Sequence, residues 1–489
     1  MTILNNKVLI QNSSLWRRLN IFPMRVKNNR YSQITMSKSK EETLAMLVMF
    51  SGATTLAWPS PALVKLKSND TRENPLGMPI KTIEVSLLVG VPYFIAIFGS
   101  LFLPKLSDLV GRKGNLQILG TAIFLNILGV AFSTRIELII IFLSIGTACF
   151  SALYTVIPVY FTEICEDHNR AKYGCVMLVF LPLGSLYTYV LGTTFSLKLF
   201  TILTAVPLIL FQILFLFAPE SPTFLLSKGK TADCISTIKR LRCNKSKEEL
   251  AEDFNKIMLN LQAINRNIKP SFFAFLKTKE GRVGYYLSIV PMIIRSSSGV
   301  PVVTALLAPI LNEAGTKISG NTGAIIVGIV SALCSVFPCF VVEKFGRKAL
   351  LIPSTLGTGS CSSILGVFFY LKYIKSPLCA YMQWLPIVCV SLYIVFYFVG
   401  LGPIPVTIPG ELFLSDVRSV GVAFVMASSA IALSLIAFTY PLLADAIGTY
   451  WCFWIFAICS FLGVLFIYFV LPETKGKTII EIQQILKNY

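Results

Sequence analysis

Long apolar stretches separated by short polar segments run through most of this chain of 489 residues. A helix needs about 20 apolar residues to cross the hydrocarbon core of a bilayer. A search for stretches of that length gives two sets of six, on either side of a polar segment at 219–282. The twelve stretches are 43–65, 82–104, 116–134, 137–160, 173–193, 198–218, 283–311, 321–342, 349–371, 380–408, 419–444 and 450–471. The pattern predicts an all-α membrane protein with twelve transmembrane helices.

The layout divides the chain into five segments, and composition agrees with it. Hydrophobic residues make up 55% of the chain and charged residues 14%, which is more apolar surface than a soluble protein of this size can cover. In the polar segment, apolar residues recur at helical spacing and predict an amphipathic helix that docks on the bundle. The segments are a basic tail at 1–42, a six-helix bundle at 43–218, a helical loop at 219–282, a second six-helix bundle at 283–471 and a tail at 472–489.

The distribution of positive charge predicts the orientation. The formal net charge is +19, a value that also occurs in nucleic-acid-binding proteins. When loops are assigned alternately to the two sides, 33 of the 43 Lys and Arg fall in the tails, the central loop and the short loops of one side, whereas nine fall on the other. Positive charge is enriched in cytoplasmic loops. We therefore expect both termini to be cytoplasmic and no nucleic-acid partner.

Two short features bear on the location of the protein. Residues 1–40 carry eight basic residues and no acidic residue, a pattern that fits either a mitochondrial presequence or a tail lying against anionic cytoplasmic lipid. We take the second interpretation and expect a multi-pass protein of the plasma membrane. Asn69-Asp70-Thr71 is a weak glycosylation signal at Asn69, in the first outer loop.

Charged motifs repeat between the two sets of helices. "SDLVGRK" at 107–113 and "VEKFGRK" at 342–348 place an acidic residue and an arginine at matching positions 235 residues apart. A second pair of motifs follows the fourth and tenth spans, again with an acid and an arginine. The chain is therefore predicted to consist of two pseudosymmetric halves. The repeated residues are Asp108 with Arg112, Glu163 with Arg170, Glu343 with Arg347, and Glu411 with Arg418.

These charges have two interpretations. Any loop needs charge to remain in water. Alternatively, halves that rock about a central site need contacts that close the inner mouth in one state and release it in the other. Exposed ion pairs contribute only about 0–1 kcal/mol each, which suits such a switch. Because the pairs repeat in both halves, we interpret these eight residues as a cytoplasmic gate.

With these repeated motifs, the chain resembles the sugar porter family of the major facilitator superfamily over residues 43–485. The motifs that match are "SDLVGRK", "PVYFTEICEDHNR" at 158–170, "PESPTFLL" at 219–226, "VGIVSALCSVFPCFVVEKFGRK" at 327–348, "GLGPIPVTIPGEL" at 400–412 and "PETKGKTIIEIQ" at 472–483. Trp58-Pro59-Ser60-Pro61 and the style of the loop motifs are most similar to the insect facilitated trehalose transporter branch. The resemblance implies the major facilitator fold, an alternating-access cycle and a sugar site between the halves.

At the expected sugar site, several residues differ from the family pattern. Leu178 takes the place of the glutamine in the fifth span, Arg295 and Ser296 replace the glutamine pair of the seventh, and Pro301 replaces the asparagine that follows. Ser331, Val406, Ser429 and Ala430 replace family amides and tryptophans in the eighth, tenth and eleventh spans. Sugar hydroxyls need polar partners once water is removed. The substrate-binding residues that we expect are Trp58, Arg295, Ser296, Ser297, Ser331 and Ser429.

Arg295 is the one basic residue in the middle of a predicted span, whereas Lys65 and Lys198 lie at span ends. A guanidinium at that depth is costly unless it faces a watery cavity or has a partner. It therefore either lines the cavity and donates to hydroxyls or to an anionic group, or reaches backbone carbonyls and only packs. No acidic residue lies well inside any predicted span, so no carboxylate is placed to carry a proton. We expect facilitated diffusion.

The sequence carries no nucleophile triad, phosphate-binding loop or zinc spacing, and its single histidine, His168, lies in a loop. We expect no enzymatic activity, no cofactor and no metal. The expected function is facilitative transport of a small polar solute, a sugar such as trehalose or a hexose. Two alternatives stay open: a non-transporting solute sensor derived from a transporter, and a facilitator of an anionic solute that pairs with Arg295.

Overall fold

The computed structural model describes most of the chain. Residues 42–489 form one compact unit, and the described part of residues 1–41 is the beginning of the first helix. The described residues are 38–164, 170–242, 246–266, 276, 278–338, 345–413, 417–475, 477 and 479–489.

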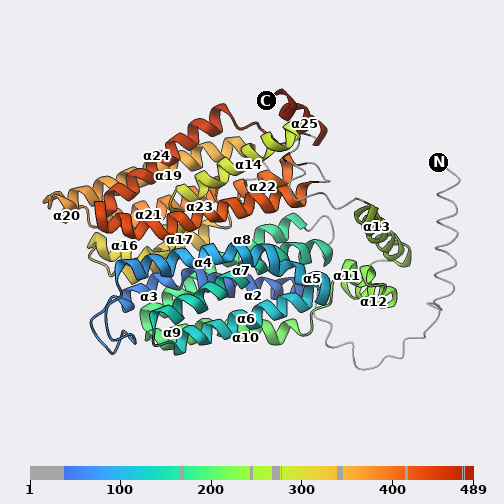
Figure 1. Cartoon of the computed structure of the whole chain (residues 1–489), viewed down its shortest axis with the longest axis horizontal. Coiled ribbons are helices and arrows are strands. Elements are labelled where there is room, and N and C mark those ends of the chain that lie inside the picture. The colour runs from blue at the N-terminus through green and yellow to red at the C-terminus, as the bar shows by residue number, and fades with distance from the viewer. Residues whose placement is uncertain are drawn as a thin grey trace. The chain divides into compact units, whose positions relative to one another are not determined.

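The first half of the molecule contains the six membrane-spanning segments before the central loop, coloured blue to green in Figure 1. Prolines break two of these segments into shorter helices, at Trp58–Pro59 and at Ala205–Pro207. The helices are α2 (Lys38–Ala57), α3 (Pro59–Leu66), α4 (Thr82–Phe102), η2 (Leu103–Leu106), α5 (Ser107–Val110), α6 (Arg112–Phe132), α7 (Ile136–Ile164), α8 (Arg170–Thr194), α9 (Leu197–Thr204) and α10 (Val206–Phe215).

The second half, coloured yellow to red, follows the central loop (Figure 1). A left-handed glycine breaks its first span, and a π-helical turn interrupts its fourth. The helices are α14 (Lys279–Ser297), α15 (Val300–Ala305), α16 (Leu307–Ala314), α17 (Gly320–Cys334), α19 (Arg347–Tyr373), α20 (Leu378–Tyr381), α21 (Leu385–Phe396), η5 (Tyr397–Leu401), α22 (Ile404–Leu412), α23 (Arg418–Ile447), α24 (Thr449–Phe469) and α25 (Ile479–Asn488).

Ten of these helices or joined helices are long and apolar enough to cross a membrane. The other two spans are α8, with 25 residues, and α17, a shorter apolar helix of 15 residues. Together they give twelve spans in the described part of the chain, and each coincides with a predicted apolar stretch. The twelve-helix prediction is therefore confirmed.

The packing between the halves follows a two-fold pattern. The second span of the first half, α4, packs on the fifth span of the second, α23. Correspondingly, the fifth span of the first half, α8, packs on the second span of the second, α17. Exchange of the two halves maps one contact onto the other. The pairing supports the pseudosymmetry inferred from the repeated motifs.

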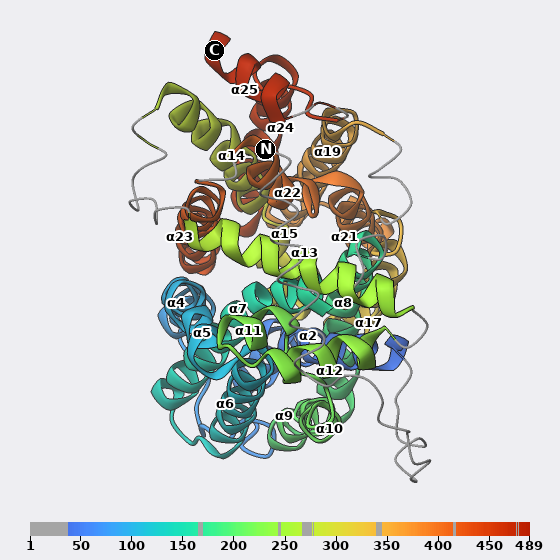
Figure 2. The same cartoon turned by 90° about the vertical axis from the view of Figure 1, so that its right-hand side faces the viewer.

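The central loop is helical in the part that the structure describes. It contains α11 (Pro222–Ser227), α12 (Thr231–Leu241) and α13 (Lys247–Arg266). Ser221 caps α11 by accepting the N–H of Phe224 at 3.2 Å. The apolar stripe of α13 includes Phe254, which is buried, and α13 packs on α11 and α12 (Figure 2). Arg242 and Asp253 join the loop helices in an ion pair of 2.7 Å.

We use two names for the ends of the bundle. The motif end carries Gly111–Lys113, Gly346–Lys348 and the central-loop helices, and the opposite end carries residues 67–81, 315–319 and 374–384 (Figure 1).

Candidate functional site

Arg295 lies where the seventh span breaks. It belongs to the last turn of α14, where the helix dipole favours a cation. The break follows because Gly299 adopts φ +82, and a Cβ at that position would lie 2.3 Å from a ring carbon of Phe456. Glycine is the residue that tolerates both conditions. The backbone therefore fixes the depth at which the arginine leaves its helix.

Hydrogen bonds from neighbouring residues hold this break. The Ser298 hydroxyl donates to the Arg295 carbonyl at 2.8 Å. The hydroxyl of Tyr393, a fully buried residue of α21, donates to the Ser298 carbonyl. The carbonyls at the end of α14 are thus partly satisfied by side chains, which stabilises the non-helical turn.

The Arg295 side chain lies near the ring of one tyrosine and interacts electrostatically with two others. Its guanidinium carbon is 6.0 Å from the centroid of the Tyr397 ring. Its charge also acts on the hydroxyls of Tyr93 in α4 and Tyr154 in α7, both in the first half. In the described structure its buried Nε atom has no hydrogen-bond partner. Among the residues that the structure describes, no acidic group forms an ion pair with Arg295.

A π-helical turn supplies the tyrosine beside Arg295. Tyr397 begins η5, and its carbonyl accepts the N–H of Gly402, five residues later, at 2.8 Å. Ser354 of α19 stabilises this turn with two hydrogen bonds. Its hydroxyl donates to the Phe396 carbonyl at 2.6 Å and accepts the N–H of Leu401 at 2.8 Å. Such turns are rare and frequently occur at functional sites.

The four predicted serines occupy different environments. Ser296 is buried, and its hydroxyl donates to the Met292 carbonyl of the same helix at 3.1 Å. Ser429 is also buried and donates to the Met426 carbonyl at 2.8 Å. Both hydroxyls therefore have partners on their own helices. Ser297 on α14 and Ser331 on α17 are half-buried.

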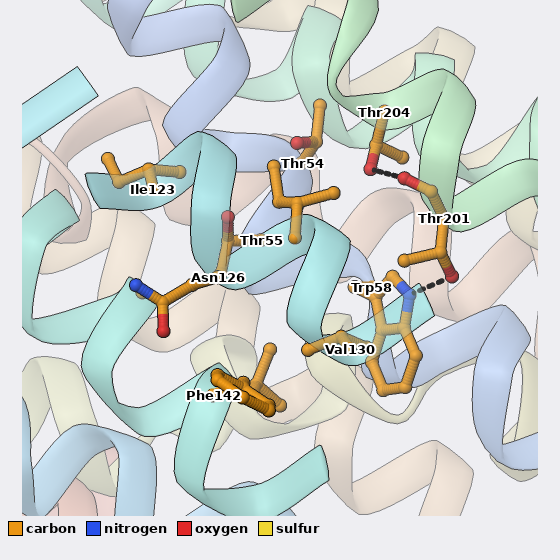
Figure 3. A pocket seen from close by; sticks show the side chains of 12 residues that line it. Thr54, Thr55, Trp58, Ile123, Asn126, Val130, Phe142, Thr201 and Thr204 are labelled. Carbon is orange, nitrogen blue, oxygen red and sulfur yellow. Dashed lines mark hydrogen bonds between the residues drawn. The ribbon is translucent and has the colours of Figure 1, made fainter. Parts of the chain in front are cut away.

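Trp58 lies inside the first half. Its indole N–H donates to the Thr201 hydroxyl of α9 at 2.8 Å, and its ring stacks on Phe200 with centroids 6.1 Å apart. It borders a cavity of about 20 Å³, lined by α2, α6, α7 and α9 (Figure 3). A space of that size holds about one water molecule. The polar lining comes from Thr54, Thr55, Asn126, Thr201 and Thr204.

The structure thus separates the six predicted substrate residues. Arg295 lies near Tyr397 of the second half and interacts electrostatically with Tyr93 of the first, whereas Trp58 takes its hydrogen bond from α9 of its own half. The sequence could not show this, because Tyr93, Tyr154 and Tyr397 are distant from Arg295 along the chain. The signal that could have found these residues is the occurrence of tyrosines within otherwise apolar spans.

At the motif end, the first half holds a network around two acidic residues. The backbone N–H groups of Arg112 and Lys113 donate to the Glu220 carboxylate at 2.9 and 3.1 Å. The Arg112 guanidinium forms an ion pair with Glu163 at 3.0 Å, and the Ser221 hydroxyl donates to Glu163. These contacts join three segments: the beginning of α6, the end of α7 and the loop before α11.

The second half repeats this network. The N–H groups of Arg347 and Lys348 each donate to the Glu473 carboxylate at 3.0 Å. Arg347 forms an ion pair with Glu411 at 2.8 Å, and the Thr474 hydroxyl donates to Glu411. Pro-Glu-Ser and Pro-Glu-Thr in the quoted motifs were the signal for Glu220 and Glu473, which the sequence reasoning did not assign a role.

Hydrogen bonding determines the charge state of Glu473. Partial burial works in the direction of a raised pKa. The backbone N–H groups of Lys475, Lys348, Arg347 and Thr474 outweigh it and hold the pKa of Glu473 below its ordinary value. The carboxylate is therefore fixed in its ionised form at neutral pH.

The partners of the predicted gate residues differ from the pairs seen along the sequence. Arg112 pairs with Glu163 and only weakly with Asp108, which lies 3.5 Å away and is 76% exposed. Arg347 pairs with Glu411. Glu343 and the side chains of Arg170 and Arg418 lie outside the described residues. The described pairs join helices within one half, so in this conformation they do not form contacts across the inner mouth.

The contacts between the halves that involve hydrogen bonds concentrate toward the opposite end. The Ser60 hydroxyl of α3 accepts the N–H of Ala308 in α16 at 3.0 Å. The Tyr189 hydroxyl of α8 donates to the Thr304 carbonyl of α15 at 2.9 Å. The hydroxyl of Thr82 donates to Asp445 at 3.1 Å. Asn69, the glycosylation candidate, is exposed at this end.

Comparison with known proteins decides the family. Residues 24–486 match the family described as "Sugar (and other) transporter". The chain belongs to this family.

Individual relatives and structures agree with the family. The facilitated trehalose transporter Tret1 of Drosophila willistoni is 26% identical over 429 residues, covering 88% of this chain and 48% of the relative. The corresponding protein of Bombyx mori is 26% identical over 410 residues, covering 83% of this chain and 79% of the relative. The chain thus spans about half the length of the Drosophila relative. The inward open xylose transporter XylE of E. coli superposes with a TM-score of 0.76 at 20% identity, covering 92% of this chain and 100% of that one.

The structural likeness establishes the major facilitator fold for this chain. A second conformation of XylE, partially occluded and inward open, superposes with a TM-score of 0.72 at 21% identity, covering 90% of this chain and 99% of that one. At these identities the likeness concerns the fold. The fold and family predicted from the sequence are therefore confirmed.

Proposed function

We propose that this protein is a facilitative transporter that carries a small polar solute, a sugar of the trehalose or hexose kind, across the plasma membrane. Family membership and the trehalose transport named for its relatives support this assignment. The observation that carries it is the pair of equivalent interfaces, α4 with α23 and α8 with α17, between two halves of six spans. Two such halves can tilt against each other and expose a central site to each side in turn.

The contacts between the halves support a specific state for this structure. Ser60 with Ala308, and Tyr189 with Thr304, join the halves toward the opposite end. The ion pairs of the motif end stay within their halves. In our proposal the opposite end faces outside and is closed, and the motif end faces the cytoplasm. The excess of Lys and Arg on the motif side and in both tails supports this orientation, with both termini cytoplasmic.

The gate residues receive a modified role in this proposal. Arg112 with Glu163, and Arg347 with Glu411, join helix ends that must move together when a half tilts. We assign them the task of keeping the cytoplasmic end of each half rigid, so that closure there occurs between preformed surfaces. Exposed charges such as Asp108 remain available to contact the other half.

Passive transport follows from the position of the acidic residues. In the described spans they occupy the first or last turns, outside the middle of the membrane. A carboxylate near the central site would be needed to couple proton and sugar movement. These residues are Glu84, Asp108, Glu137, Glu163, Glu280, Glu313, Glu411 and Asp445.

Counterflow in vesicles tests the proposal. Purified protein is reconstituted into liposomes loaded with unlabelled trehalose, glucose or xylose, and entry of the labelled sugar is followed with and without a pH gradient. We expect saturable entry of at least one sugar above that of protein-free liposomes, unchanged by a protonophore. Absence of flux for every sugar contradicts transport, and flux that collapses with the protonophore contradicts facilitated diffusion.

A further inference from the structure

The charge of Arg295, in the last turn of α14, has no described acidic partner. In the described structure no ion pair involves this residue, and its buried Nε has no hydrogen-bond partner. The Tyr397 ring lies at 6.0 Å, the outer limit for a cation–π contact, so it compensates the charge only slightly. The acidic residues of the spans are in end turns. Since no described acidic residue supplies the counter-charge, a bound anion is the group that can supply it.

Alternating access makes this requirement stronger. Between the outward and inward states the site closes around its cargo and loses water. An arginine without an anion is disfavoured in such a medium. A neutral sugar offers hydroxyl acceptors but leaves the charge in place. A carboxylate accepts two parallel hydrogen bonds from the guanidinium and also cancels its charge. Closure is therefore favoured with an anionic cargo.

The neighbours of Arg295 suit the remainder of a sugar. Tyr93 and Tyr154 come from the first half and Tyr397 from the second, and phenol groups both donate to and accept from hydroxyls. Their rings also offer flat apolar faces to a pyranose. A molecule that touches all three would contact both halves at once, as a cargo that triggers closure must.

We propose that Arg295 binds the carboxylate of a sugar acid, a hexuronate, and that this protein prefers such anionic sugars to their neutral counterparts. This inference rests on the proposed function and specifies its substrate class. The tyrosines from both halves bind the hydroxyls of the same molecule. Arg295 is then the residue that determines selectivity by charge.

The test compares two molecules of nearly equal size, glucuronate and glucuronamide, which differ in charge. In liposomes holding the full chain, we expect each to compete with labelled glucuronate, with glucuronate at least tenfold more potent. Labelled glucuronate should also enter by counterflow, and an inside-positive membrane potential should increase its accumulation. Equal potency of the two molecules overturns the inference, whether or not neutral sugars are transported.

Variants separate the charge from the fold. Arg295→Gln should reduce the preference for glucuronate to less than threefold, and Arg295→Lys should retain part of it. Arg72→Gln, which removes an exposed guanidinium in the loop at 67–81, is the matched control and should leave the preference unchanged. An unchanged preference in Arg295→Gln overturns the inference.

The panel also distinguishes failure of the two proposals. Flux of glucose or trehalose without preference for glucuronate leaves sugar transport standing and overturns the selectivity. Flux of lactate at the rate of glucuronate shows a general carboxylate site and overturns the assignment to sugar acids. Absence of flux for every solute contradicts the proposed function itself.

Discussion

The Glu473 carboxylate offers the clearest test of how the second half is held together. Its two oxygens accept the N–H groups of Arg347 and Lys348 at the start of α19, each at 3.0 Å, and that of Lys475, also at 3.0 Å. Replacing it by glutamine keeps the size but leaves one acceptor oxygen. A hydrogen bond to a charged group contributes about 1.5–3 kcal/mol. We use the lower part of that range because this carboxylate is partly exposed.

The expected loss from Glu473→Gln is about 2 kcal/mol of unfolding free energy, since one charged bond is lost and the others become neutral. If residues 283–489 unfold as one unit, the entropy of unfolding is about 0.4 kcal/mol/K, so the midpoint falls by about 5 °C. Thermal unfolding of the purified protein in detergent measures this shift. Glu220→Gln should cause a similar decrease, because Glu220 caps the equivalent helix of the first half.

The contribution of Glu473 to stability should change with pH in one direction, which its pKa determines. Because the folded state holds the pKa of Glu473 below its ordinary value, the ionised group stabilises the fold above the unfolded pKa of about 4.3. That contribution disappears as the pH falls through the folded value. The difference between wild type and Glu473→Gln should therefore be full at pH 7 and shrink below pH 4. Glu73→Gln, at an exposed loop position, is the control. A midpoint for Glu473→Gln within 1 °C of that control at pH 7 would refute the reasoning.

Three further changes test the rest of the structure. Ser60→Ala removes the hydrogen bond to Ala308 between the halves. A loss of about 1 kcal/mol should shift the populations about fivefold toward separation of the opposite end, visible as longer distances between spin labels placed there on each half. Unchanged distances would contradict a role in closure. Trp58→Phe loses the bond to Thr201, so we expect lower thermal stability with an unchanged KM, and a raised KM would instead indicate substrate contact. Asn69→Gln should abolish any mobility shift on glycosidase treatment of protein from eukaryotic cells, and a shift that persists would contradict glycosylation at this site.

The spans could be predicted from sequence because membrane insertion depends on a local property, the apolar length of a segment. The repeated Gly-Arg-Lys motifs likewise revealed two halves. Their partners could not be predicted in the same way. Arg112 follows Asp108 closely in sequence, yet its stronger partner is Glu163 on another helix. Which acid an arginine meets depends on how helix ends pack, and periodicity carries no information about that.

The surroundings of Arg295 show the same limit. Arg295 could be picked out from the sequence because a charged residue in the middle of an apolar stretch is unusual. The surroundings of Arg295 depend on Gly299, whose left-handed backbone ends α14, and on the π-turn at Tyr397. Neither conformation has a strong sequence signature. The four predicted serines looked equally suitable as ligands, but Ser296 and Ser429 donate to their own helices.

The confinement of the ion pairs to single halves has a consequence for the energetics of the transport cycle. If Arg112 with Glu163 and Arg347 with Glu411 persist through every state, neither ion pair separates during turnover. Of the described contacts between the halves at the opposite end, those of Ser60 and Tyr189 join neutral groups, and that of Thr82 reaches the Asp445 carboxylate. The speed of opening at that end should then depend only weakly on ionic strength.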